Sequence, residues 1–415
     1  MARAMKDSGV TWIGTIPASW AVGRIGQLYT ERKEKVSDTE FQPLSVTMKG
    51  VLPQLSTAAK TDAHDDRKLV RKGDFAINSR SDRRGSCGVS PLDGSVSLIN
   101  TILTPRDEMH PGYYDWMFHS TMFSDEFYKW GHGIVDDLWT TNWQDMKSIL
   151  VPTPPLPEQS RIATFLDCRC AEIDQIMEQT RVTIEEYKKL RQSIITEAVT
   201  HGVRGDRKMK DSGVEWIGDI PESWDAQKFK YIAQVKANLV EPDGYVDYLQ
   251  VSPENIEKGT GRLMPCRTVS EVGVTSGNHL FYKGQILYSK IRPKLNKITI
   301  APFDGLCSAD MYPIETTQNT RYLLYAMLSD VLLVQVSMIT EDRVKMPKIN
   351  QDELGNTWFP VAPEEEQNEI VFYLDYRCVE IDRLIDSKQQ LLTELEAYKK
   401  SVIYEYVTGK REVPQ

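Results

Sequence analysis

The sequence lacks the features that mark membrane, secreted and zinc-binding proteins. No apolar run reaches the roughly 20 residues of a membrane-spanning helix, and no signal peptide opens the chain. Six cysteines occur among 415 residues, and none of them forms a CxxC pair or a zinc-ligand spacing. We therefore expect a cytoplasmic protein with reduced thiols and no membrane partner.

Catalytic signatures are also missing from the sequence. It contains no Walker A loop, no GxGxxG loop after a strand-like run, and no HxxxH or HxE zinc spacing. Adenine methyltransferases carry an Asn/Asp-Pro-Pro-aromatic motif, but Thr153-Pro-Pro155 has neither the amide nor the aromatic ring. These absences predict a chain without bond-making groups, and they point to recognition as its chemistry.

What the sequence does contain is a tandem duplication. Residues 5–20, here called the tryptophan motif, return as residues 209–224, with thirteen of sixteen positions identical at an offset of 204. The run LDCRCAEID at residues 166–174 returns as LDYRCVEID at residues 374–382, at an offset of 208. Each copy consists of a tryptophan motif, a variable globular part and a long helix, in that order. Because the repeat period is more than 200 residues, the chain is not a short-period solenoid.

The two copies of the long segment, residues 158–200 and 366–408, predict two long helices. Neither copy contains Gly or Pro, and each would be about 60 Å long at 1.5 Å per residue. The stripe expected in the first copy is Ile162, Phe165, Leu166, Ile173, Ile176, Ile184, Tyr187, Leu190, Ile194 and Ala198. The seam expected in the second copy is Ile381, Leu384, Leu391, Leu395, Tyr398 and Val402. Because a lone helix of this length cannot cover its stripe, we expect the copies to pack on each other.

The variable parts have the pattern of small α+β domains. Strand-like runs at residues 74–77, 95–99, 285–288 and 297–301 are separated by Gly, Pro and Asp, and helical patterns follow at residues 113–129 and 321–336. The predicted domains are residues 1–156, a helix at 157–203, a second globular part at 204–362, and a helix with a tail at 363–415. The tryptophans of both tryptophan motifs are expected to pack into the core.

The net charge of −9 argues against nucleic-acid binding, but the charge is segregated. Residues 67–84 and 283–297 form two basic runs, each a strand followed by a polar loop. Arg pairs with guanine, Asn with adenine, and Ser or Lys with phosphate. The predicted DNA contacts are Arg67, Lys68, Asn78, Ser79, Arg80, Arg83, Arg84, Tyr288, Ser289, Lys290, Arg292, Lys294, Asn296 and Lys297. The alternative is a polar loop on a solvated edge.

Three features together resemble the specificity subunit of type I restriction–modification enzymes: the tryptophan motifs, the run PPLPEQ at residues 154–159 and the repeated helix. The second copy departs from this pattern at residues 362–367, APEEEQ, where the proline run is reduced. The resemblance implies two target recognition domains that each read half of a bipartite, asymmetric DNA site. It also implies that the two helices form an antiparallel coiled coil that acts as a ruler.

The resemblance further implies partners that carry the catalytic groups. Two methyltransferase subunits would bind S-adenosylmethionine, flip out an adenine and methylate N6. Restriction subunits that use ATP and Mg²⁺ would translocate and cut unmodified DNA. This chain would hold no cofactor or metal and would not itself be an enzyme. The alternatives are a stand-alone bipartite DNA-binding regulator, a coiled-coil adaptor that binds only protein, and an enzyme with unrecognised motifs.

Overall fold

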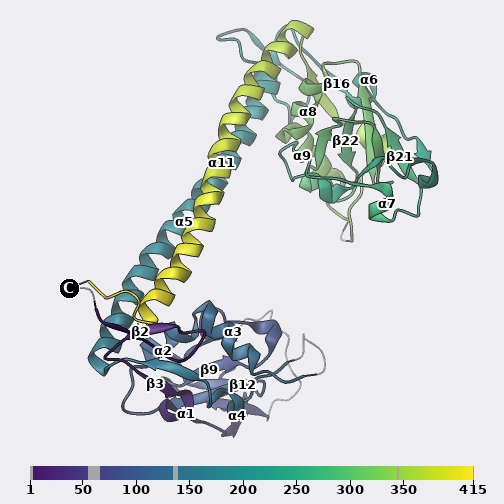
Figure 1. Cartoon of the computed structure of the whole chain (residues 1–415). Helices are drawn as coiled ribbons and strands as arrows, with labels where there is room; N and C mark the ends of the chain where they lie inside the picture. Colours follow the sequence, from purple (N-terminus) through teal and green to yellow (C-terminus); the bar gives the residue numbers. More distant parts are fainter. Residues whose placement is uncertain (1–2, 55–65, 134–138, 344, 415) are drawn as a thin grey trace. The chain divides into compact units, whose positions relative to one another are not determined.

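The computed structural model describes residues 3–54, 66–133, 139–343 and 345–414, and it divides the chain into two compact units (Figure 1). Unit 1 comprises residues 1–180 and 390–415, and unit 2 comprises residues 181–389. Each unit contains one globular α+β part together with a stretch of both long helices. The α+β fold class predicted from the sequence is confirmed.

The two long helices are α5 (Leu156–His201) and α11 (Glu364–Val407). Pro157 lies in the first turn of α5, where its missing N–H would have no partner in the helix. Acidic residues occupy the first turn of both helices, where the helix dipole favours negative charge. The predicted helices at residues 158–200 and 366–408 therefore form within two residues of the expected ends.

The long helices lie side by side in each unit. In unit 1, the ring of Phe165 lies 4.5 Å from that of Tyr406, and Lys399 Nζ lies 2.6 Å from Asp174 Oδ1. The contacts join the beginning of α5 to the end of α11 in unit 1. In unit 2 they join the end of α5 to the beginning of α11, as in the 3.0 Å ion pair between Arg191 Nε and Asp382 Oδ1. The pairing is therefore antiparallel within each unit (Figure 1).

The buried stripe of the helices differs in part from the predicted one. Cys170 and Met177 are buried, whereas the predicted Ile176 and Leu190 are each 45% exposed. The predicted Leu384 and Tyr398 of α11 are also exposed. These positions were predicted wrongly because the residues are apolar but lie off the buried stripe. A shift of one position along the helix turns a side chain by about 100°, away from the partner helix.

Both globular parts are built on a four-stranded antiparallel sheet of the same order, β10-β9-β12-β4 in unit 1 and β23-β22-β25-β17 in unit 2. The unit 1 strands are β4 (Tyr29–Glu31), β9 (Phe75–Asn78), β10 (Cys87–Val89) and β12 (Asn100–Pro105). The unit 2 strands are β17 (Ala233–Val235), β22 (Ile286–Ser289), β23 (Ile298–Ile300) and β25 (Met311–Thr316). The two variable parts therefore share a topology that their sequences do not show.

A second sheet packs on one face of each four-stranded sheet. In unit 1 it has the order β11-β8-β5, and the hairpin β6-β7 packs beside it. In unit 2 the order is β18-β21-β24-β19-β20. The unit 1 strands are β5 (Lys35–Val36), β6 (Leu44–Thr47), β7 (Gly50–Pro53), β8 (Arg67–Val70) and β11 (Gly94–Ser97). The unit 2 strands are β18 (Leu239–Val240), β19 (Leu249–Val251), β20 (Arg267–Thr268), β21 (Asn278–Phe281) and β24 (Gly305–Cys307).

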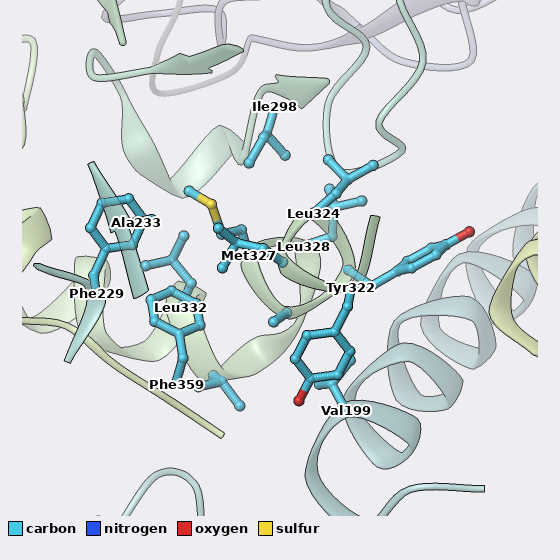
Figure 2. Packing of buried hydrophobic residues seen from close by; sticks show 14 of the residues in the cluster. Val199, Phe229, Ala233, Ile298, Tyr322, Leu324, Met327, Leu328, Leu332 and Phe359 are labelled. Atoms are coloured by element: carbon cyan, nitrogen blue, oxygen red, sulfur yellow. The ribbon is translucent and has the colours of Figure 1, made fainter. Parts of the chain in front are cut away.

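Alternation along the central strands explains the layers. In β22, Ile286 and Tyr288 face the helices, while Leu287 between them faces the second sheet. In β9, Phe75 and Ile77 likewise face the helical side. Figure 2 shows the helical side of unit 2, where Phe229, Met327 and Phe359 are gathered with other apolar side chains.

Each predicted helix in the variable parts is two helices. The pattern at residues 113–129 forms α2 (Pro111–Phe118) and α3 (Thr121–Lys129), and the pattern at 321–336 forms α8 (Thr320–Leu328) and α9 (Asp330–Ile339). The break falls at Ser120 and Ser329, whose side chains accept hydrogen bonds from Phe123 N and Val331 N. Serine favours this N-cap position because its hydroxyl satisfies an amide that has no partner in the helix.

Changing Ser329 to alanine should lower the free energy of unfolding by about 1 kcal/mol, the usual value of an N-cap. Chemical denaturation of the full chain measures this change. Ser337→Ala, at a half-buried position inside α9, is the matched control and should alter stability by less than about 0.5 kcal/mol. Equal effects of the two substitutions would contradict the capping role.

The tryptophan motifs join each globular part to the long helices. Each motif holds a hairpin, β1 (Met5–Asp7) with β2 (Thr15–Pro17) and β14 (Met209–Asp211) with β15 (Asp219–Pro221). Trp20 and Trp224 are buried, as expected, and their Nε1 atoms donate to Glu158 and Glu366 at 2.8 and 3.1 Å. These glutamates lie in the first turns of α5 and α11, so equivalent contacts fasten both motifs.

A short antiparallel pair closes each globular part, and short helices connect its strands. The pairs are β3 (Ala21–Arg24) with β13 (Leu150–Thr153) and β16 (Asp225–Lys228) with β26 (Trp358–Val361). The short helices are α1 (Ile25–Leu28), α4 (Trp143–Met146), α6 (Phe229–Ile232), α7 (Val269–Val272) and α10 (Gln351–Gly355).

Among the described residues, no single helix is long and apolar enough to cross a membrane. In the described part of the chain, α8 and α9 reach the required length and composition only as a pair bent by 57°, and α8 is mostly buried in the protein. The same ranges of the chain hold no group of three or more His, Cys, Asp or Glu side chains placed to bind a metal ion.

Candidate nucleic-acid interface

Two basic loops occupy the same place in the two units. Loop 1 (residues 79–86) joins β9 to β10, and loop 2 (residues 290–297) joins β22 to β23. Each loop contains one turn of 3₁₀ helix, η1 (Ser81–Arg83) or η5 (Pro293–Leu295). The predicted contacts therefore lie at equivalent ends of equivalent sheets, which the sequence comparison of the variable parts does not reveal.

Loop 1 presents three arginines to solvent. Arg80, Arg83 and Arg84 are exposed. The Arg83 side chain is 67% exposed and has a loose ion pair, 3.6 Å long, with Asp82 of the same loop. Such exposed, weakly held guanidinium groups are free to exchange their contacts for a base edge or a phosphate at little cost.

Arg84 is held in place without being covered. Its guanidinium lies 5.2 Å from the ring centre of Tyr128, and its Nη1 lies 3.4 Å from Asp125 Oδ1. The planar group therefore rests on an aromatic face contributed by α3, and such stacking limits its rotation. The guanidinium group of Arg84 is therefore more firmly oriented for bidentate contact with a base edge than that of Arg83.

Loop 2 presents Arg292 and Lys294. Both side chains are exposed, and Arg292 has a φ of 46°, in the left-handed region that a non-glycine residue adopts only under constraint. The constraint comes from the backbone, because Arg292 N donates to Pro347 O at 2.7 Å. Lys290 and Lys297 are half-buried; the Lys290 ammonium lies 5.3 Å from the Tyr312 ring centre, and Lys297 Nζ donates to Pro253 O.

Several predicted contacts in unit 1 instead hold the domain together. Arg67 is buried, donates to the hydroxyl and carbonyl of Ser95 at 2.9 Å, and has a pKa lowered by burial. Ser79 is buried against the Thr101 hydroxyl at 3.1 Å. These two residues are corrected to structural ones, because contact with DNA would require their internal hydrogen bonds to break.

Lys68 and Asn78 are intermediate cases. Lys68 is half-buried and donates to Asn100 O at 2.6 Å, and burial lowers its pKa. Asn78 uses its side-chain oxygen to accept from Arg80 N at 3.0 Å, and this bond shapes the start of loop 1. Both groups would have to give up these internal hydrogen bonds to use the same atoms in base recognition.

Three predicted contacts in unit 2 are also inside the domain. Tyr288 has no exposed surface and faces the helical core, and burial raises its pKa. Ser289 is buried and donates to Ile291 O at 3.1 Å. Asn296 is buried and donates to Met327 O and Leu328 O at the end of α8. These three are corrected to structural residues that support loop 2.

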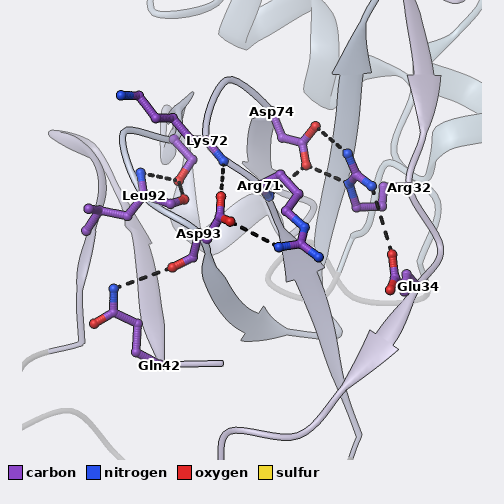
Figure 3. A network of polar contacts seen from close by, with 9 residues as sticks. Arg32, Glu34, Gln42, Arg71, Lys72, Asp74, Leu92 and Asp93 are labelled. Carbon is purple, nitrogen blue, oxygen red and sulfur yellow. Dashed lines mark hydrogen bonds and ion pairs between the residues drawn. The ribbon is translucent and has the colours of Figure 1, made fainter. Parts of the chain in front are cut away.

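A polar network fixes the turn that leads into β9. Figure 3 shows the carboxylate of Asp74 bound by Arg32, whose Nε lies 2.6 Å from Oδ2, and that of Asp93 bound by Arg71 and by the Lys72 amide. The Lys72 amide and the Arg71 side chain lower the pKa of Asp93. Arg71 and Lys72 of the basic run therefore shape the turn at Gly73, whose φ of 92° matches the 91° of Gly284 in unit 2.

Each loop pairs with a second segment that sequence reasoning missed. Loop 1 pairs with the segment after α3 through the bridge from Arg80 to Thr140, and Thr140 also bridges to His132 of that segment. Loop 2 pairs with the segment after α9, through the bridge from Ile291 to Lys348. Lys345 is exposed in that segment. The short basic spacing RVKMPK at residues 343–348 is the signal that would have found it.

In unit 2, loop 2 is tied to the long helices. The buried side chain of Arg191 in α5 donates to Gly259 O at 3.1 Å and to Thr260 O at 2.8 Å, while pairing with Asp382 of α11. Gly259 N then donates to Asn296 O at 3.1 Å. Arg191 therefore connects both helices, through Gly259, to Asn296 at the C-terminal end of loop 2.

Comparison with known proteins accords with this arrangement. No protein-family model matches the chain. The type I restriction enzyme EcoDI specificity subunit of Escherichia coli is 31% identical over 281 aligned positions, covering 64% of this chain and 63% of that protein, just under two thirds of its length. The type I restriction enzyme MjaVIII specificity subunit of Methanocaldococcus jannaschii is 23% identical over 429 aligned positions, covering 95% of this chain and 93% of that protein.

A solved structure has the same fold. A chain from work on the complex assembly and conformational transition of the type I R-M system matches with a TM-score of 0.71 at 14% identity, covering 95% of this chain and 99% of that one. The resemblance predicted from the tryptophan motifs and repeated helices is thus confirmed: the curated relatives carry the name of type I specificity subunits.

Proposed function

We propose that this chain, a homologue of type I specificity subunits, is the non-catalytic DNA-reading subunit of a type I restriction–modification complex. Loop 1 and loop 2 read the two halves of a bipartite, asymmetric site in double-stranded DNA. The observation that carries this proposal is the pair of basic loops at equivalent ends of two equivalent sheets. One chain thereby provides the two reading surfaces that a symmetric repressor obtains by dimerisation.

The bond-making groups belong to the partners. Two methyltransferase subunits bind S-adenosylmethionine and methylate adenine N6, and restriction subunits bind ATP and Mg²⁺. The relatives named as specificity subunits support this division of labour.

Reconstitution with the methyltransferase encoded beside this gene tests the proposal. The mixture should methylate adenine in a specific sequence, and neither protein should do so alone. Methylation by this chain alone would make it an enzyme. Salt-dependent DNA binding by the chain with no methyltransferase beside it would favour the stand-alone regulator. A complex that binds no DNA would favour the protein adaptor.

The long helices serve in this proposal as a ruler that sets the unread spacer. Removing seven residues from each helix, 180–186 and 387–393, preserves the 3.5-residue repeat of the seam and shortens the pair by about 10 Å. At about 3.4 Å per base pair, the spacer should lose about three base pairs while both half-sites stay the same.

Methylation mapping of a host carrying the shortened chain measures the spacer. The matched control exchanges residues 180–186 for their repeat counterparts, 388–394, without a change of length, and should leave the spacer unaltered. An unchanged spacer in the shortened chain would exclude the ruler, and a change in either half-site would show that the deletion disturbs the reading loops.

A further inference from the structure

The beginning of α11 exposes an aromatic stripe. Phe372 is 80% exposed, Tyr376 is 61% exposed, and Val379 is also exposed. Their spacing of four and three residues places them on one face of the helix. Tyr373 borders this face and, with Phe372 and Val203, lines a hollow of about 590 Å³. A contiguous exposed apolar face of this kind marks a protein interface.

The repeat supplies an internal comparison. At the offset of 208, the positions of Phe372, Tyr376 and Val379 correspond to Thr164, Cys168 and Ala171 of α5. The side chains at these three positions of α5 are also exposed, but they are small. The two copies of the same helix therefore present different surfaces: the stripe of unit 2 is aromatic, and its counterpart in unit 1 is not.

An aromatic side chain beside the counterpart stripe of unit 1 is covered by its own chain. Phe165, the equivalent of Tyr373, packs its ring 4.5 Å from Tyr406, whose equivalent in unit 2 is Ala198. Arg169 Nη2 donates a hydrogen bond to the Tyr398 hydroxyl at 3.3 Å. Phe165, Tyr398 and Pro414 line a separate hollow in unit 1. Phe165 of unit 1 thus has an aromatic partner within the chain, whereas its equivalent Tyr373 and the stripe of unit 2 are exposed.

Charge indicates what covers the open stripe. Residues 364–382 carry seven carboxylates against one arginine, whereas the equivalent residues 156–174 carry four against two. Arg204 pairs with Glu369, and Arg321 pairs with Asp375, so part of this charge is neutralised inside unit 2. Glu365 is exposed and lines the hollow, and its neighbour Glu364 is exposed as well. A complementary surface is apolar at its centre and cationic at its edge.

We propose that the stripe Phe372, Tyr376 and Val379 is the stronger of two unequal docking faces for the methyltransferase subunit, and that it receives an apolar segment flanked by Lys or Arg. The weaker face is the counterpart around Thr164 and Cys168. Two copies of one partner therefore bind in order, the first to unit 2. This inference rests on the proposed function, because it takes the methyltransferase as the occupant.

Calorimetric titration of the full chain with the adjacent-gene methyltransferase tests the proposal. The wild-type chain should bind two copies with distinct dissociation constants. Phe372→Ser combined with Tyr376→Ser should weaken the tighter step by about 30-fold or more, the size of one interface hot spot, and the weaker step by less than about threefold. Because both side chains are exposed, the variant should keep the melting temperature of the wild type.

A transplant provides the reciprocal variant. Thr164→Phe combined with Cys168→Tyr copies the aromatic side chains onto α5 and should tighten the weaker binding step. Thr164→Ser combined with Cys168→Ser is the matched control, and it should change neither binding step. Two equal constants in the wild type, or equal weakening of both steps by the serine variant, would overturn the inference while leaving the proposed function intact. A wild-type chain that dimerises through this stripe would assign it to a second copy and would also overturn it. Failure of the chain to bind any methyltransferase would instead refute the proposed function.

Discussion

Changing Arg80, Arg83 and Arg84 together to alanine should abolish recognition of the first half-site and leave that of the second intact. These are the exposed guanidinium groups of loop 1. Each one that contacts a base should contribute about 1–3 kcal/mol of discrimination, or about 5- to 150-fold in the dissociation constant. The measurement is the affinity of the assembled methyltransferase complex for duplexes altered in one half-site at a time, at fixed salt.

The reciprocal variant serves as the control. Arg292→Ala with Lys294→Ala removes the exposed cations of loop 2, and it should reduce discrimination at the second half-site alone. An equal loss on every duplex, with a shallower dependence on salt, would assign the loop 1 arginines to phosphate contacts. If neither variant loses affinity for any duplex, the two loops are polar turns on a solvated edge and do not contact DNA.

The second large effect is expected from Arg191→Met. Arg191 is buried and binds Gly259 O, Thr260 O and the Asp382 carboxylate. Burial raises the pKa of Asp382, and the Arg191 and Arg262 guanidinium groups counter that rise. Removing Arg191 leaves Asp382 without its nearest counter-charge, which costs about 3 kcal/mol of unfolding free energy for a pair of this kind.

The same substitution should relax discrimination at the second half-site by about tenfold. Loss of the hydrogen bonds to Gly259 and Thr260 frees the segment that pairs with Asn296 at the end of loop 2. The first half-site should be unaffected, because these contacts lie in unit 2. Chemical denaturation and the duplex affinities described above measure the two effects.

The repeat offers a matched control for this experiment. Lys399 is the equivalent of Arg191 at the offset of 208, and it pairs with Asp174, the equivalent of Asp382. The Asp174 side chain is 57% exposed, so Lys399→Met should cost less than about 1 kcal/mol. Equal destabilisation by the two substitutions would contradict the positioning role of Arg191. Normal recognition of the second half-site by the Arg191→Met variant would contradict it as well.

The sequence was sufficient to predict the long helices and their pairing. The offset of 208 marks α5 and α11 as copies, and their length leaves an apolar stripe that needs a partner. It was insufficient to identify each buried position, because Ile176 and Met177 are adjacent apolar residues and only the phase of the helix decides between them. The break at Ser329 was missed because apolar periodicity continues across it, although a capping serine was visible.

The two loops of the candidate site could be proposed from the sequence, but the exposure of their side chains could not. Basic residues identified both loops, yet the side chains of Arg67 and Asn296 satisfy carbonyl groups inside the domain. Composition does not distinguish a buried arginine with internal acceptors from an exposed one. Tyr288 was a different error, since alternation with the buried Ile286 already placed it on the core face of β22. Lys345 was missed because its segment is distant in sequence and meets loop 2 through tertiary contacts of Pro347 and Lys348.

Long-read methylation mapping of the host genome, with and without this gene, tests the central claim most directly. Two loops on one chain should produce one methylated adenine motif with two short, unrelated half-sites separated by a fixed number of unread bases, and the whole motif should vanish when the gene is deleted. A methylation pattern that is unchanged by the deletion, or a lost motif that is a single uninterrupted sequence, would contradict the account.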